Sequence, residues 1–155
     1  MRALLGLLLC TATCFGGPPQ APRRIVSQAV GTDEMLLAVA DPSQIAALSH
    51  ISRSPEFSGV AREAAAFPQL KGGDAEDILK FKPDLVLMTS YSRPELVQQV
   101  RKTGVQVCFI ARFESLEDAY ADLRLVAQAV GHPERAEPVI QSCRKRVESL
   151  AARLR

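Results

Sequence analysis

The clearest structural signal in the sequence is an unbroken apolar run, Leu-Val-Leu-Met, at positions 85–88. A Pro-Asp pair precedes this run, and the polar segment Thr-Ser-Tyr-Ser follows it. A short apolar run between turn residues is typical of a strand that is buried on both faces. We therefore predict that residues 85–88 form the central strand of a parallel sheet.

Further apolar segments alternate with helical patterns along the rest of the chain. Strands are predicted at residues 25–27, 45–48 and 105–110, and helices around residues 32–39, 75–81, 94–103 and 116–130. This alternation favours an α/β fold, a Rossmann-like three-layer domain with a parallel sheet of four or five strands. In such folds ligands meet the loops that leave the carboxyl ends of the strands. We therefore expect the functional residues in those loops.

Capping residues indicate where several of these helices begin. A side-chain oxygen just before a helix accepts a hydrogen bond from a backbone N–H group of its first turn. The expected caps are Thr32, Asp74, Ser92 together with Glu95, and Ser115 together with Asp118. Gly131 is expected to end the helix that begins after Ser115.

The last helical pattern starts at Pro133 and continues to the last residues. Its apolar positions recur every three or four residues, at Ala136, Val139, Ile140, Cys143, Val147, Leu150 and Leu154. The basic residues at 144–146 are expected on its solvated face. Because the apolar stripe reaches the last residues, we expect something to lie beyond it, in the same gene or in a partner. The isolated chain should associate or fray there.

The first residues have the pattern of a secretory signal. A basic second residue is followed by an apolar core at 3–15 and by Gly-Gly-Pro-Pro at 16–19. This core is too short to span a bilayer permanently. We predict a signal peptide at residues 1–17, a periplasmic address and no stable membrane insertion. A lipid anchor on Cys10 or Cys14 is the less favoured alternative, because no Gly, Ala or Ser precedes either cysteine.

Composition and charge exclude several classes of function. The 19 basic and 17 acidic residues are interspersed and give a net charge of +2, which provides no footprint for nucleic acid. Cys108 and Cys143 could pair in an oxidising compartment, although the apolar surroundings of Cys108 favour a buried free thiol. Neither cysteine has a Cys or His partner at zinc spacing, so no metal site is predicted. Nucleophile-elbow, phosphate-loop and metalloprotease motifs are lacking, and no enzymatic activity is expected.

Several motifs along the chain carry a family resemblance. They are Arg-Ile-Val-Ser at 24–27, Thr-Asp-Glu at 32–34, Ala-Ala-Leu-Ser at 46–49, Gly-Gly-Asp-Ala-Glu-Asp-Ile-Leu at 72–79 and Phe-Lys-Pro-Asp-Leu-Val-Leu at 81–87. The Lys-Pro-Asp-Leu-Val core with the upstream Glu-x-Ile-Leu is the most specific of them. Together they resemble the amino-terminal lobe of periplasmic binding proteins that serve ABC importers of cobalamin, haem and iron siderophores.

This resemblance implies a domain organisation and a function. Members of the family have two α/β lobes joined by a long helix, with the ligand in the cleft between the lobes. Residues 18–131 would form the amino-terminal lobe and residues 132–155 the start of the connecting helix, with the carboxyl-terminal lobe absent. The protein would capture a metal chelate in the periplasm and deliver it to the membrane permease, without an intrinsic cofactor. The alternative is a secreted α/β interaction module that does not transport a ligand.

The resemblance also implies roles for particular residues. Glu76 would dock into an arginine pocket of the permease, although a carboxylate in the first turn of a helix also stabilises the helix dipole. Cleft-lining loops would contribute His50, Lys71, Tyr91 and Arg93 to ligand binding. Tyrosine offers a flat apolar ring to a macrocycle, and arginine a fork to anionic groups. Each of these four could instead be an ordinary surface residue, and His132 is expected to be structural.

Overall fold

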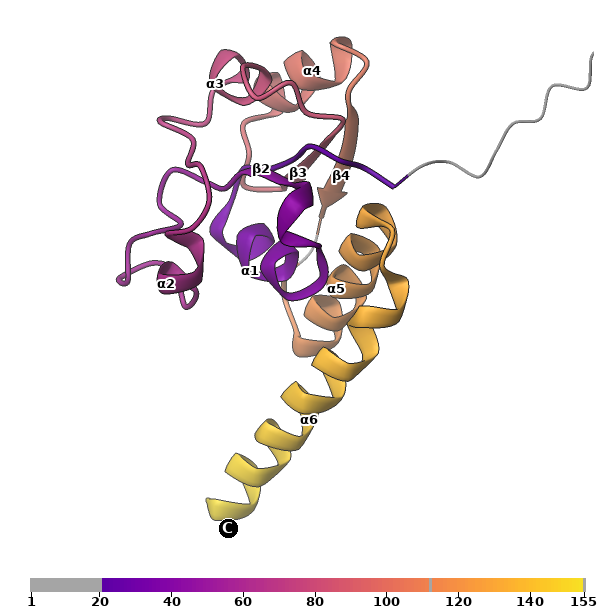
Figure 1. The fold of residues 1–155 in the computed structure, drawn as a ribbon. Coiled ribbons are helices and arrows are strands. Elements are labelled where there is room, and N and C mark those ends of the chain that lie inside the picture. The colour runs from indigo at the N-terminus through magenta and orange to yellow at the C-terminus, as the bar shows by residue number, and fades with distance from the viewer. Residues whose placement is uncertain (1–20, 112, 155) are drawn as a thin grey trace, which may run out of the picture.

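The computed structural model describes residues 21–111 and 113–154, so the predicted signal peptide lies outside the described residues. Strands and helices alternate along the chain (Figure 1). In order they are β1 (Ile25–Ser27), α1 (Val30–Val39), β2 (Ile45–Ala47), α2 (Ala61–Ala64), α3 (Ala75–Leu79), β3 (Leu85–Thr89), α4 (Pro94–Lys102), β4 (Gln106–Ile110), α5 (Leu116–Val130) and α6 (Ala136–Arg153). Short 3₁₀ turns at Pro42–Gln44 and Pro133–Arg135 precede β2 and α6.

The four strands form one parallel sheet in the order β2-β1-β3-β4. β3 is an inner strand, with Leu85 paired to Ile25 of β1 and Leu87 paired to Cys108 of β4. The prediction of a parallel sheet with residues 85–88 inside it is therefore confirmed. Because all strands run in the same direction, their carboxyl ends lie at one edge of the sheet.

Helices cover both faces of the sheet and make a three-layer domain. Leu85 and Leu87 pack into a cluster with α1, α5 and the start of α6. Val86 and Met88 point to the opposite face and pack against α3 and α4. All four side chains are fully buried, which explains why positions 85–88 are all apolar.

Two of the expected helix caps are correct and two are wrong. Asp74 accepts a hydrogen bond from the Asp77 amide at 2.8 Å, and Ser115 caps α5 in the same way. Thr32 is not a cap, because α1 begins earlier and its hydroxyl lies 2.7 Å from that of Ser27. Ser92 is not a cap either, since Arg93 occupies that position of α4. Both hydroxyls instead make contacts at the carboxyl edge of the sheet.

The turn between α5 and α6 is held by charged side chains. Gly131 ends α5 in a left-handed conformation, with φ of 88°, as expected. His132 Nε2 lies 3.0 Å from an Asp41 carboxylate oxygen, and Arg135 contacts the other oxygen at 2.8 Å.

Among the described residues, no helix combines the length and hydropathy that crossing a bilayer requires.

The two described cysteines are unpaired in the structure. Cys108 is buried within β4, and burial raises the pKa of its thiol to about 11, with the nearby Asp122 carboxylate adding to the effect. Cys143 is exposed on α6. The interpretation of Cys108 as a small core residue agrees with this arrangement.

Because β3 is buried on both faces, truncating a leucine in it should lower the free energy of unfolding far more than truncating an exposed leucine. Leu87→Ala should lower the free energy of unfolding by about 2–5 kcal/mol, because it opens a cavity in the core. Leu125→Ala, at a side chain that is 44% exposed, is the matched control and should cost less than about 1 kcal/mol. Urea unfolding followed by circular dichroism measures both. Equal losses for the two variants would contradict the central position of β3.

Candidate functional site at the carboxyl edge of the sheet

The loops that leave β1 and β3 are tied together by a chain of hydrogen bonds. Gln28 is the first residue after β1, and Ser92 lies in the loop after β3. The Ser92 hydroxyl donates to Gln28 Oε1 at 2.6 Å and accepts from the Thr89 amide at 3.2 Å. Sequence reasoning missed Gln28, because one glutamine after a short strand carries no pattern. Only its position directly after a strand could have indicated it.

The loop before α3 runs alongside the loop that leaves β2. The Leu70 amide donates to the Leu48 carbonyl at 2.9 Å, and the Gln69 side chain donates to the His50 carbonyl at 2.6 Å. A Cβ atom at Gly73 would lie 3.5 Å from Gln28 Nε2 and 4.0 Å from His50 Nδ1. The backbone therefore approaches both side chains closely, and Gln28 and His50 converge at the start of α3.

The four predicted ligand-binding residues are all exposed in loops of this region. Tyr91 is 81% exposed in the loop after β3, where its amide donates to the Thr89 hydroxyl. Arg93 occupies the cap position of α4, and Lys71 precedes Gly72 in the loop before α3. Among these four residues, His50 is the one whose side chain lies close to the backbone at Gly73. Ligand contacts of all four residues stay predictions.

Asp77 holds the loop before α3 in place. One of its carboxylate oxygens accepts hydrogen bonds from three consecutive amides, those of Lys71, Gly72 and Gly73, at 2.6–3.1 Å. Its other oxygen forms an ion pair with Lys80. Burial alone would raise the pKa of Asp77, but the hydrogen bonds from Lys80 and these amides hold it well below its usual range. This contribution to stability is present at neutral pH and is lost in acid.

Glu76 lies next to Asp77 in α3, and its side chain is open to solvent. It is the second residue of α3 and is exposed, whereas its neighbour Asp77 is buried. A shallow depression of about 270 Å³ lies here, lined by Lys71, Gly72, Asp74, Glu76, Asp77 and Lys80. Glu76 is therefore available to a partner at the same edge as the loops that leave the strands.

A buried carboxylate ties α1 to the loop that carries His50. Asp33 is fully buried and accepts hydrogen bonds from the Ser49 amide at 3.1 Å and the Ser49 hydroxyl at 2.5 Å. Burial raises the pKa of Asp33 to about 6, an effect that Glu34 reinforces and the serine hydrogen bonds oppose. In the sequence, Asp33 stands out only as part of the Thr-Asp-Glu motif at 32–34.

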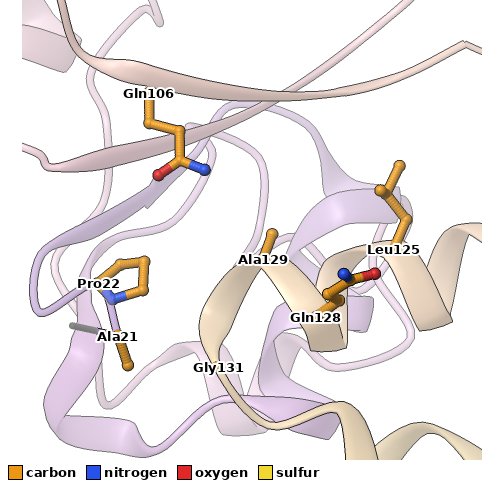
Figure 2. A pocket seen from close by; sticks show the side chains of 7 residues that line it. All are labelled: Ala21, Pro22, Gln106, Leu125, Gln128, Ala129 and Gly131. Carbon is orange, nitrogen blue, oxygen red and sulfur yellow. The ribbon is translucent and has the colours of Figure 1, made fainter. Parts of the chain in front are cut away.

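A pocket of about 400 Å³ lies away from this edge, where β4 begins and α5 ends (Figure 2). It is lined by Ala21, Pro22, Gln106, Leu125, Gln128, Ala129 and Gly131. None of these side chains is charged or a usual metal ligand. Across the described parts of the chain, no group of three or more His, Cys, Asp or Glu residues could hold a metal ion. We therefore keep the carboxyl edge, where parallel α/β folds bind their ligands, as the candidate site.

Comparison with known proteins gives a consistent result. A family model described as periplasmic binding protein matches residues 25–155. The chain is 32% identical over 135 residues to the vitamin B12-binding protein of Pectobacterium carotovorum subsp. carotovorum (strain PC1), covering 86% of this chain and 46% of that protein. It is 29% identical over 153 residues to the vitamin B12-binding protein of Yersinia pseudotuberculosis serotype O:1b, covering 98% of this chain and 52% of that protein. The chain thus spans about half the length of the curated relatives it matches.

Solved structures with the same fold include haem-binding and vitamin B12-binding proteins. A periplasmic haem-binding protein from Pseudomonas aeruginosa matches with a TM-score of 0.70 and 24% identity, covering 84% of this chain and 46% of that one. The periplasmic vitamin B12-binding protein of Vibrio cholerae matches with a TM-score of 0.67 and 20% identity, covering 86% and 51%. At these identities the likeness shows the fold alone.

The burial of Asp33 predicts a pH-dependent difference between the parent chain and Asp33→Asn. In the unfolded chain Asp33 ionises near pH 3.8, but in the folded chain it stays protonated until about pH 6. The stability that this group contributes is therefore present below pH 4 and is lost as the pH rises through 6.

Between pH 4 and pH 8 the parent should lose about 2–3 kcal/mol of unfolding free energy relative to Asp33→Asn. Urea unfolding of both proteins at several pH values measures this difference. Parallel pH profiles would show that Asp33 ionises as it does in water.

Proposed function

The chain belongs to the periplasmic binding protein family, and we propose that it is the amino-terminal lobe of a substrate-binding protein for an ABC importer. The family match over residues 25–155 carries this proposal. Residues 18–131 would be the amino-terminal lobe, and residues 132–155 would begin the helix that connects it to a second lobe. The named relatives are binding proteins, so a binding function is proposed and no catalytic step.

The proposed ligand is a metal chelate, with cobalamin first and haem or a ferric siderophore next. The curated relatives named above support cobalamin, because they are vitamin B12-binding proteins. The chemistry of the carboxyl edge suits a large polar macrocycle. The exposed Tyr91 ring offers an apolar face, and the Gln28 and His50 side chains offer hydrogen bonds. Lys71 and Arg93 would attract anionic groups at the periphery of the ligand.

Delivery would take place in the periplasm through contact with the importer's permease. Glu76 is exposed at the start of α3, next to the loops that would hold the ligand. A carboxylate there can form a charge-assisted pair with an arginine of the permease. Such a pair gains strength when docking removes water from it. The second candidate function is an interaction module without a ligand, which the exposed apolar residues of α6 favour.

Titration with cyanocobalamin, and separately with ferric haem, tests the binding function. The chain should bind one of the two without converting it, and the absorbance spectrum reports the complex. Gln28→Ala and His50→Ala should each weaken binding by about 3–10-fold, the value of one hydrogen bond. Gln128→Ala is the matched control, because that glutamine lines the distant pocket of Figure 2. Absence of binding to both chelates, and to a panel of ferric siderophores, would favour the interaction module.

Substitution of Glu76 tests the docking step separately from ligand binding. In a protein that has both lobes, Glu76→Gln should leave the fold and the ligand affinity nearly unchanged, yet weaken binding to the permease reconstituted in lipid nanodiscs by about tenfold or more. Glu76→Arg should be worse because of like-charge repulsion. Glu95→Gln is the matched control, since Glu95 is the exposed second residue of α4. If the Glu76→Gln chain docks like the parent, Glu76 has no docking role and serves only to stabilise the first turn of α3.

A further inference from the structure

Residues 49–59, here called the serine loop, lie between β2 and α2 and carry His50 near their start (Figure 1). The buried side chains of this loop are those of three serines, Ser49, Ser52 and Ser58. Its apolar side chains lie outside both core clusters, and Phe57 is 63% exposed. Polar contacts rather than hydrophobic burial therefore determine where the serine loop lies.

Two neighbouring carboxylates of α1 hold the two ends of the serine loop. Asp33 accepts hydrogen bonds from the amide and the hydroxyl of Ser49, the first residue of the loop, at 3.1 and 2.5 Å. Glu34 accepts one from the amide of Gly59, the last residue, at 3.0 Å. A Cβ atom at Gly59 would lie only 3.3 Å from the same Glu34 oxygen, so the lack of a side chain there leaves room for the carboxylate. One turn of α1 thus anchors both ends of the loop.

The interior of the serine loop is bonded mainly to itself. The Ser52 amide donates to the Ser49 carbonyl at 3.1 Å. The Phe57 and Ser58 amides both donate to the Ser54 carbonyl, at 3.1 and 2.9 Å. Because these turns join residues of the same loop, the loop forms one body between its two anchors. Loss of either anchor should free this body as a whole.

His50 takes its position from the serine loop. It follows the anchored Ser49 directly, and its own carbonyl accepts a hydrogen bond from the Gln69 side chain at 2.6 Å. The backbone is therefore held on both sides of the imidazole, whose Nδ1 would lie 4.0 Å from a Cβ atom at Gly73. The carboxylates on α1 can thus act on the carboxyl edge through His50.

A second role of the two carboxylates makes a different prediction for amide substitutions. Negative charge near the start of a helix stabilises the helix dipole, and this effect is lost when the charge is removed. Anchoring needs only an acceptor oxygen, which asparagine and glutamine retain. Asp33→Asn and Glu34→Gln therefore separate the two roles.

We propose that Asp33 and Glu34 are positioning residues, which hold the serine loop as one body and thereby set the orientation of His50 at the carboxyl edge. The ligand contact of His50 rests on the proposed function. The anchoring of the loop is a property of the free chain and is tested without a ligand.

The imidazole NMR signals of the full chain report the orientation of His50. The sequence contains two histidines, and the second, His132, lies in the turn between α5 and α6 and serves as the internal reference. At a fixed pH, Asp33→Ala and Glu34→Ala should each shift the His50 signals and leave those of His132 in place. Asp33→Asn and Glu34→Gln should keep the His50 signals close to those of the parent. Glu63→Ala is the matched control, because Glu63 is exposed on α2 just beyond the loop.

Amide hydrogen exchange tests whether the serine loop moves as one body. Glu34→Ala changes an exposed side chain, so the core should stay folded even if Asp33→Ala does not fold. In Glu34→Ala the amides of Ser52, Phe57 and Ser58 should exchange about tenfold faster or more, together with that of Gly59. The amides of β3 should change much less. Faster exchange at Gly59 alone would overturn the proposal.

Ligand affinity links the anchors to His50. For the chelate that the parent binds, cyanocobalamin or ferric haem, Glu34→Ala should weaken binding by about threefold or more, but should have no effect in a His50→Ala background. Equal effects in both backgrounds would overturn the proposal, as would His50 signals that respond alike to Glu34→Ala and Glu34→Gln. A parent chain that binds no chelate would count against the proposed function, and the His50 signals and exchange rates would still decide whether the anchors hold the loop.

Discussion

Burial of β3 on both faces is the constraint from which the rest of the architecture follows. A strand with apolar side chains on both faces is stable only when helices cover both. α1 and α5 provide one cover, and α3 and α4 provide the other. The helices also connect strands that run in the same direction, so every strand ends at the same edge. The candidate site lies at this edge because the loops that leave all the parallel strands meet there.

Features set by local chemistry could be predicted from the sequence, and features set by tertiary partners could not. The strand at Leu85–Thr89 and the cap at Asp74 depend on neighbouring residues and were predicted correctly. Thr32 and Ser92 are residue types that often cap helices, but their hydroxyls bond to other side chains. Thr32 bonds to Ser27 at the end of β1, and Ser92 bonds to Gln28, which is distant in the sequence. Gln28 could not be predicted for the same reason, because its partners come from the loop after β3 and from the loop before α3.

Two aspartates at the same edge have pKa values that are shifted in opposite directions. Asp33 receives too few donors to offset its loss of water, so its pKa rises. Asp77 receives three amides and an ammonium group, so its pKa falls despite burial. The loop before α3 is therefore held by a carboxylate that stays charged even in mild acid, whereas the loop that carries His50 is held by Asp33, which becomes charged only above about pH 6. Sequence position alone does not distinguish the two, because both aspartates lie in the first turn of a helix.

The hydrogen bond from Ser92, in the loop after β3, determines which end of the Gln28 side chain is available at the carboxyl edge. The Ser92 hydroxyl has one hydrogen, and it is directed to Gln28 Oε1. The amide oxygen is thereby occupied, and Nε2, which has hydrogens but no lone pair, is the Gln28 atom nearest Gly73. At this point Gln28 offers its Nε2 hydrogens and not its oxygen. Molecules that present carbonyl, carboxylate or hydroxyl oxygens can accept from Nε2, and groups that present only N–H cannot.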